Sequence, residues 1–223
     1  MKRLFLFPAF CASLLLAACK PADAPPDSSS TTTAEAPAAP VVSNAYSADT
    51  GLQLYSLRSQ FKLKGVPRTL DTVKSFGIKL VELAGTYDME PAAFKAELDS
   101  RGLKAVSAHF PYGRWEREPE TVAQEAKALG IEFAGCAWAA HATPLDELQA
   151  RDIAAVFNKA GEALAKVGIK FFYHLHGFEF QKWKKGETLA DLLIQETDPE
   201  NVKFQMDVLW VVYPGQDPVA LLE

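Results

Sequence analysis

The sequence predicts an α/β fold of the closed (β/α)8 TIM-barrel type, with about six of the eight βα units present. A glycine followed by a short apolar segment recurs four times, each time after a stretch with helical spacing. No glycine-rich phosphate loop follows the first expected strand, which disfavours a dinucleotide-binding sheet. Polar residues gather where the expected strands end, which is where barrel enzymes assemble their sites.

The repeated unit is a helix, a glycine and a strand. The strand segments follow Gly77, Gly102, Gly130 and Gly168, and glycine readily takes the left-handed conformation that ends a helix. The preceding apolar residues at helical spacing are Leu70, Val73 and Phe76; Phe94 and Leu98; Val122, Ala126 and Leu129; and Ile153, Val156, Phe157, Ala160 and Leu164. Further strands expected at residues 52–55 and 202–206 bring the number to six. Strands that alternate with helices indicate a parallel sheet with right-handed crossovers.

The N-terminal region is typical of export. Lys2 and Arg3 precede a short apolar run, and Cys19 follows two alanines, so residues 1–18 resemble a bacterial lipoprotein signal peptide. This resemblance implies lipidation of Cys19 and anchoring at the periplasmic face, with the outer membrane slightly favoured. Residues 19–50 are rich in Pro, Ala, Ser and Thr and predict a disordered tether. Residues 51–223 then form the barrel domain.

Composition excludes some partners. The formal net charge is -5, and no basic patch indicates nucleic-acid binding. Of three cysteines, only Cys136 lies in the domain, which predicts a buried apolar residue and no disulfide framework.

Residues 173–180 bring together several side chains that can bind a metal or transfer a proton. They place two imidazoles and a carboxylate at the end of an apolar strand. His174 and His176 share a face if the strand continues, because side chains repeat every two residues. Imidazole and carboxylate groups suit a divalent metal or a proton-transfer site. Polar residues that only cap a strand end are the alternative. The other polar residues at strand ends are Gln53, Arg58, Glu82, His109, His141 and Asp207.

Five motifs occur in an order that carries a resemblance: residues 51–58, 81–85, 106–110, 173–180 and 204–210. Together they resemble the sugar phosphate isomerase/epimerase family, the xylose isomerase-like barrels, across residues 51–223. The resemblance implies a divalent cation, Mn²⁺ first and Mg²⁺, Co²⁺ or Zn²⁺ as alternatives. By position, Glu179 and Asp207 are the implied ligands. The remaining implied ligands, a His and a Glu, belong to strands seven and eight, which this sequence lacks, so the chain resembles a C-terminally truncated barrel and the resemblance leaves its native end open.

The site residues follow from the same motifs. Glu179 and His176 are the expected catalytic residues, Glu179 serving as ligand or as base. The residues expected to contact substrate are His109, His174, Glu82, Arg58 and Trp210. Glu82 has a second interpretation, as an ion-pair partner of Arg58. Leu175 and Gly177 stand where the family more commonly has Asn and Asp.

The sequence thus predicts a metal-dependent isomerase or epimerase that acts on a sugar, keto-sugar or cyclitol through an enediolate-type proton transfer. One alternative is a carbohydrate-binding lipoprotein without catalysis. Another is a lyase or hydrolase of oxidised glycosides on the same fold. A chain that lacks two βα units is expected to be inactive by itself, and oligomer formation is left open.

Overall fold

The computed structural model describes residues 50–222 of the protein. The expected signal peptide, the lipidation site Cys19 and all of the expected tether except its last residue lie outside this range. Within residues 50–222, no helix is both long enough and apolar enough to cross a membrane.

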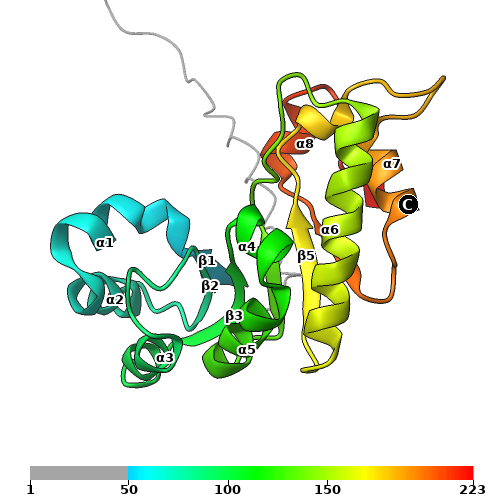
Figure 1. The fold of residues 1–223 in the computed structure, drawn as a ribbon. Coiled ribbons are helices and arrows are strands. Elements are labelled where there is room, and N and C mark those ends of the chain that lie inside the picture. The colour runs from blue at the N-terminus through cyan, green and yellow to red at the C-terminus, as the bar shows by residue number, and fades with distance from the viewer. Residues whose placement is uncertain (1–49, 223) are drawn as a thin grey trace, which may run out of the picture. The chain divides into compact units, whose positions relative to one another are not determined.

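Six strands form one parallel sheet in chain order, from β1 to β6 (Figure 1). The strands are β1 (Gly51–Gln53), β2 (Leu80–Leu83), β3 (Lys104–His109), β4 (Phe133–Cys136), β5 (Lys170–His174) and β6 (Val202–Gln205). Every pair of neighbours is parallel. Helices alternate with these strands, so the predicted TIM-barrel type of fold is confirmed, with six βα units in the described residues.

The helices pack against one another in chain order, as Figure 1 shows for α2, α3, α5, α6 and α7. They are α1 (Arg58–Lys64), α2 (Val66–Ser75), α3 (Pro91–Asp99), α4 (Tyr112–Arg117), α5 (Pro119–Leu129), α6 (Glu147–Ala165), α7 (Leu189–Glu196) and α8 (Val208–Val212). The short 3₁₀ turns are η1 (Leu54–Leu57), η2 (Phe178–Phe180) and η3 (Ala220–Leu222).

The first strand ends earlier than expected. It was predicted over residues 52–55, but residues 54–57 form the turn η1 and leave Gln53 as the last strand residue. This places Gln53 at the carboxyl end of the sheet. Gly65 then separates α1 from α2 with a φ of 78°, a conformation that glycine adopts at little cost.

The two faces of the sheet differ in polarity because side chains alternate along each strand. Val81, Leu83, Phe171 and Tyr173 are fully buried in the apolar core. The residues between them in β2 and β5, such as Glu82, project to the opposite face. Polar groups at the ends of several strands therefore reach one inner surface.

Gly135 on β4 allows β5 to approach closely at this inner surface. A Cβ atom at this position would lie 2.2 Å from the carbonyl oxygen of Phe172 and 2.7 Å from its ring. No side chain fits there without a shift of the backbone. The Phe172 ring instead packs edge-on against His109, with 5.0 Å between ring centroids.

Candidate active site at the carboxyl ends of the strands

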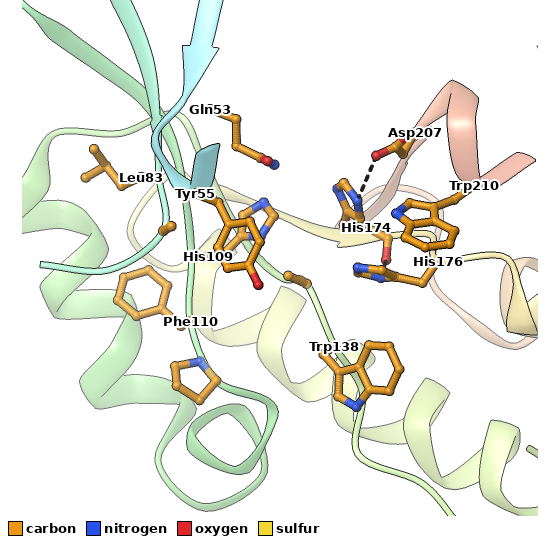
Figure 2. A pocket seen from close by; sticks show the side chains of 13 residues that line it. Gln53, Tyr55, Leu83, His109, Phe110, Trp138, His174, His176, Asp207 and Trp210 are labelled. Atoms are coloured by element: carbon orange, nitrogen blue, oxygen red, sulfur yellow. Dashed lines mark hydrogen bonds and ion pairs between the residues drawn. The ribbon is translucent and has the colours of Figure 1, made fainter. Parts of the chain in front are cut away.

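A cavity of about 670 Å³ opens at the carboxyl ends of the strands. Figure 2 shows the polar and aromatic side chains that face it. The lining residues are Gln53, Tyr55, Leu83, Ala84, His109, Phe110, Pro111, Ala137, Trp138, His174, His176, Asp207 and Trp210. They lie at the carboxyl ends of the six described strands or in the segments that follow them. The volume lies in the range typical of small-molecule sites.

Glu82, at the end of β2, organises the polar inner surface. One carboxylate oxygen accepts hydrogen bonds from Ser107 Oγ at 2.7 Å and from Gln205 Nε2 at 2.8 Å. The other accepts one from Gln53 Nε2 at 2.7 Å and lies 3.1 Å from His109 Nε2, an ion-pair contact. Its donors come from β1, β3 and β6, so one carboxylate ties both outer strands to the middle of the sheet.

The environment of Glu82 favours its ionised form. Burial by itself raises the pKa of a carboxylate. In this site the contact with His109, the charge of His109 and the hydrogen bonds from Ser107 and Gln53 together outweigh the effect of burial. They lower the pKa of Glu82 to about 2. Three hydrogen-bond donors and the His109 ring surround the two carboxylate oxygens. We therefore assign Glu82 the role of holding its neighbours in place.

Arg58 lies away from this network. It is exposed at the start of α1, where its guanidinium stacks over the Tyr55 ring at 4.2 Å and donates to the Tyr55 carbonyl at 3.0 Å. It does not pair with Glu82 and does not line the cavity. Tyr55 lines the cavity, and Arg58 contacts Tyr55 without lining the cavity itself.

His174 and Asp207 lie close together at the carboxyl ends of two neighbouring strands. His174 is the last residue of β5, and Asp207 follows β6. His174 Nε2 lies 3.5 Å from Asp207 Oδ2, the contact that is dashed in Figure 2. Its other ring nitrogen, Nδ1, lies 2.6 Å from Gln205 Oε1. Asp207 also accepts a hydrogen bond from the Leu209 backbone at 2.9 Å, which caps the start of α8. Both side chains are thereby fixed at the cavity wall.

His176 joins the polar surface to a group of aromatic rings. Its ring lies 5.4 Å from Trp138 and 5.7 Å from Trp210, between centroids. Phe178 and His141 extend the group, with their rings 4.3 Å apart. Burial, followed by the charge of His174, lowers the pKa of His176 below its ordinary value. The ring is therefore neutral at neutral pH.

The His176 ring has a defined tautomer. Its Nδ1 lies 3.2 Å from the backbone carbonyl of His174. A carbonyl oxygen only accepts, so Nδ1 carries the hydrogen and Nε2 keeps its lone pair.

Glu179 lies behind the cavity wall and is fully buried. One of its oxygens accepts from Tyr173 Oη at 2.6 Å, and the other from the His176 backbone N–H at 3.1 Å. Burial raises its pKa despite these hydrogen bonds. Gly177, with a φ of 93°, reverses the chain and turns Glu179 inward in η2. Glu179 holds the loop that carries His176 and does not line the cavity.

The expected metal ligands do not come together. Asp207 faces the cavity, whereas the oxygens of Glu179 are occupied by Tyr173 and His176. Among residues 50–222, no group of three or more His, Cys, Asp or Glu side chains is placed to hold a metal ion. The pair His174 and Asp207 supplies two donor atoms, fewer than the three protein ligands of a typical catalytic zinc site. The described residues therefore do not form a complete metal site.

Ser107 and Gln205 take part in the site although the motifs did not single them out. Gln205 is the last residue of β6 and stands two residues before Asp207. Ser107 stands two residues before His109 in the same way. A polar residue two positions before a polar residue at the strand end was the signal that identifies both.

The fold is that of the xylose isomerase-like TIM barrels, as expected from the motifs. The chain is similar to the crystal structure of a sugar phosphate isomerase/epimerase from Parabacteroides distasonis ATCC 8503, with a TM-score of 0.68 and 25% identity over 80% of this chain and 72% of that one. It is also similar in fold to a D-psicose 3-epimerase solved in the presence of D-fructose, with a TM-score of 0.55 and 16% identity over 75% of this chain and 66% of that one.

In sequence, the chain is similar to the inosose dehydratase of Clostridium botulinum (strain Alaska E43 / Type E3). The two are 27% identical in an alignment of 168 positions that covers 66% of this chain. The chain spans 55% of the length of that curated relative. No family model matches the chain.

Proposed function

We propose that this chain contributes the substrate cavity of a carbohydrate isomerase or epimerase whose substrate is a sugar, keto-sugar or cyclitol. The observation that carries the proposal is one cavity in which polar and aromatic side chains meet. His109, His174 and Asp207 offer polar atoms for hydroxyl groups, and Trp138 and Trp210 offer ring faces. The similarity to sugar isomerases and epimerases supports this substrate class.

His176 is the residue that we propose for proton transfer. The reaction removes the proton from a carbon next to a carbonyl and returns it to the neighbouring or the same carbon, through an enediolate. His176 is neutral, faces the cavity and carries its lone pair on Nε2. We further propose that Glu179, expected from the motifs as ligand or base, acts through the backbone N–H of His176 and keeps the loop in position.

The lining favours an uncharged substrate. It contains no Lys or Arg among the described residues, and its one carboxylate, Asp207, adds negative charge. A phosphate ester requires cationic or backbone N–H partners. We therefore propose a neutral sugar, keto-sugar or cyclitol.

A dehydratase is the second candidate, because the curated relative is an inosose dehydratase. Elimination of water begins with the same step, proton removal beside a carbonyl. It then differs, since the hydroxyl on the next carbon takes a proton and leaves as water. The same base therefore serves either reaction, and the product decides between them.

The test follows solvent deuterium into a panel of D-fructose, L-ribulose and an inosose by NMR in D₂O, with Mn²⁺ added or with a chelator. With the full-length native protein we expect exchange at the carbon beside the carbonyl, and its loss in His176→Asn. Exchange with retention of all hydroxyls indicates an isomerase or epimerase, and loss of water indicates the dehydratase. Saturable binding that survives chelation without any exchange would support the binding protein instead. Neither exchange nor binding would contradict both.

The export signal leads to a separate proposal, that Cys19 is lipidated and anchors the protein at the periplasmic face. Incorporation of a labelled fatty acid into the wild-type protein, and none into Cys19→Ala, is the expected result. Equal labelling of the two would contradict it.

A further inference from the structure

The amide of Gln205 lies between two residues of the site, Glu82 and His174. Its Nε2 is 2.8 Å from Glu82 Oε2, and its Oε1 is 2.6 Å from His174 Nδ1. The register of β5 and β6 pairs His174 with Gln205, and the Leu175 N–H donates to the Gln205 carbonyl at 3.2 Å. Backbone and side chain thus hold the amide beside the imidazole.

The direction of both hydrogen bonds is determined by Glu82. An ionised carboxylate only accepts hydrogen bonds, so Gln205 must turn its NH₂ group toward Glu82. The amide oxygen then faces His174, and this oxygen also only accepts. His174 must therefore carry a hydrogen on Nδ1.

We infer that Gln205 is a positioning residue that holds the neutral His174 ring in the Nδ1–H tautomer, with Nε2 as an acceptor beside Asp207. Partners of the second ring nitrogen commonly determine which nitrogen of a histidine does the chemistry. We call Glu82, Gln205 and His174 the relay. Glu82 also accepts a hydrogen bond from a second amide, that of Gln53, which lies 29 residues earlier in the chain.

The relay also defines what a ligand must offer at this point. When the His174 ring is neutral, Nε2 and Asp207 Oδ2 are both acceptors, 3.5 Å apart. A ligand group that binds between them must donate, as a sugar hydroxyl does. This consequence rests on the proposed function, whereas the tautomer itself does not.

The experiment compares two variants, each of which removes one side-chain amide that donates a hydrogen bond to Glu82. Gln205→Met removes the acceptor of His174 Nδ1, while Glu82 keeps Ser107, Gln53 and His109. Gln53→Met removes a different amide donor of Glu82, at 2.7 Å, and leaves Gln205 in place. Circular dichroism of each variant reports whether the fold is retained.

The readout is the long-range ¹H–¹⁵N correlation spectrum of ring-labelled histidines, recorded without ligand at a pH where His174 is neutral. His174→Asn assigns the signals. We expect a protonated Nδ1 and a bare Nε2 for His174 in the wild type and in Gln53→Met. In Gln205→Met we expect the pattern to shift toward the Nε2–H tautomer.

Two results would overturn the inference. One is an Nε2–H tautomer of His174 in the wild-type protein, read once His174→Asn has assigned its signals. The other is a folded Gln205→Met variant with the wild-type pattern. Because no substrate is present, the absence of turnover in the exchange assay leaves this measurement unaffected, so the two proposals fail separately.

Discussion

Gln205 on β6 donates a hydrogen bond of 2.8 Å to Glu82 on β2, although 123 residues separate them in the chain. The strands themselves are not neighbours, since β2 pairs with β1 and β3, and β6 pairs with β5. The contact therefore crosses the inner surface of the sheet. The position of β6, the last described strand, therefore depends on the carboxylate of Glu82 in β2.

Acid should weaken the fold through Glu82. Its pKa is lowered from 4.5 to about 2, so its stabilising contribution is complete above the unfolded-state value and is lost as the pH falls from about 4.5 toward 2. A shift of this size corresponds to a contribution on the order of 3 kcal/mol. We expect the free energy of unfolding of Glu82→Gln, from urea denaturation, to fall less steeply over this range.

The exposed Glu162 on α6 provides the control. Glu162→Gln should follow the wild-type pH dependence. If Glu82→Gln shows the same slope as the wild type between pH 4.5 and 2, the network does not hold Glu82 ionised in solution.

Glu179 should tolerate an amide better than an apolar side chain. Glu179→Ala leaves Tyr173 Oη and the His176 N–H without an acceptor and opens a cavity in the core. We expect a loss of about 2 to 4 kcal/mol in the free energy of unfolding. Glu179→Gln keeps one carbonyl oxygen as acceptor and removes a buried charge, so its loss should be smaller.

The same pair of variants separates a positioning role from direct chemistry. If Glu179 acts through the His176 loop, Glu179→Gln should retain deuterium exchange and ligand binding. A stable Glu179→Gln variant that has lost exchange completely would instead restore Glu179 as the base or as a metal ligand.

The order of strands and helices was predictable because it depends on local signals. Each glycine that ends a helix, such as Gly130 with a φ of 71°, is visible in the sequence together with the apolar segment after it. Polar residues at the strand ends indicated the site, and the cavity includes His109, His174 and Asp207 among them.

The direction of individual side chains was not predictable in the same way. His174 and His176 were expected to share a face if the strand continued, but β5 ends at His174 and the chain turns at Gly177. Glu179 consequently points into the core. The contacts of Gln205 depend on the curvature of the whole sheet, and no local pattern in the sequence encodes that.

Gly135 should be hard to replace. In Gly135→Ala the new Cβ would meet the Phe172 backbone at 2.2 Å, and backbone shifts in a packed core are costly. The Gly135 carbonyl also accepts from Trp115 Nε1 at 3.1 Å and from the Phe110 N–H at 2.8 Å, so a shift disturbs these too. We expect a loss of about 2 kcal/mol or more, measured by urea denaturation.

Gly113→Ala is the matched control for this substitution. Its Cβ would meet only the guanidinium end of Arg117, at 2.8 Å, which can move aside. The residue lies in α4, where alanine is favoured over glycine. If Gly135→Ala and Gly113→Ala lower the free energy of unfolding equally, the close approach of β4 and β5 is not the reason that position 135 requires glycine.

The aromatic rings at the cavity should contribute to ligand affinity without contributing to catalysis. Trp138 is 55% exposed and Trp210 also lines the cavity, so both present ring faces to a bound sugar. For Trp138→Ala and Trp210→Ala we expect about tenfold weaker binding each, or about 1.4 kcal/mol. Isothermal titration calorimetry with the keto-sugar or cyclitol that shows exchange measures this directly.

Trp183 offers a tryptophan outside the cavity for comparison. Its ring lies under Lys184 Nζ at 3.6 Å, and it is absent from the cavity lining. Trp183→Ala should bind the ligand as the wild type does. If all three variants bind equally well, the sugar does not stack on Trp138 or Trp210, and the affinity must come from the polar surface around His174 and Asp207 alone.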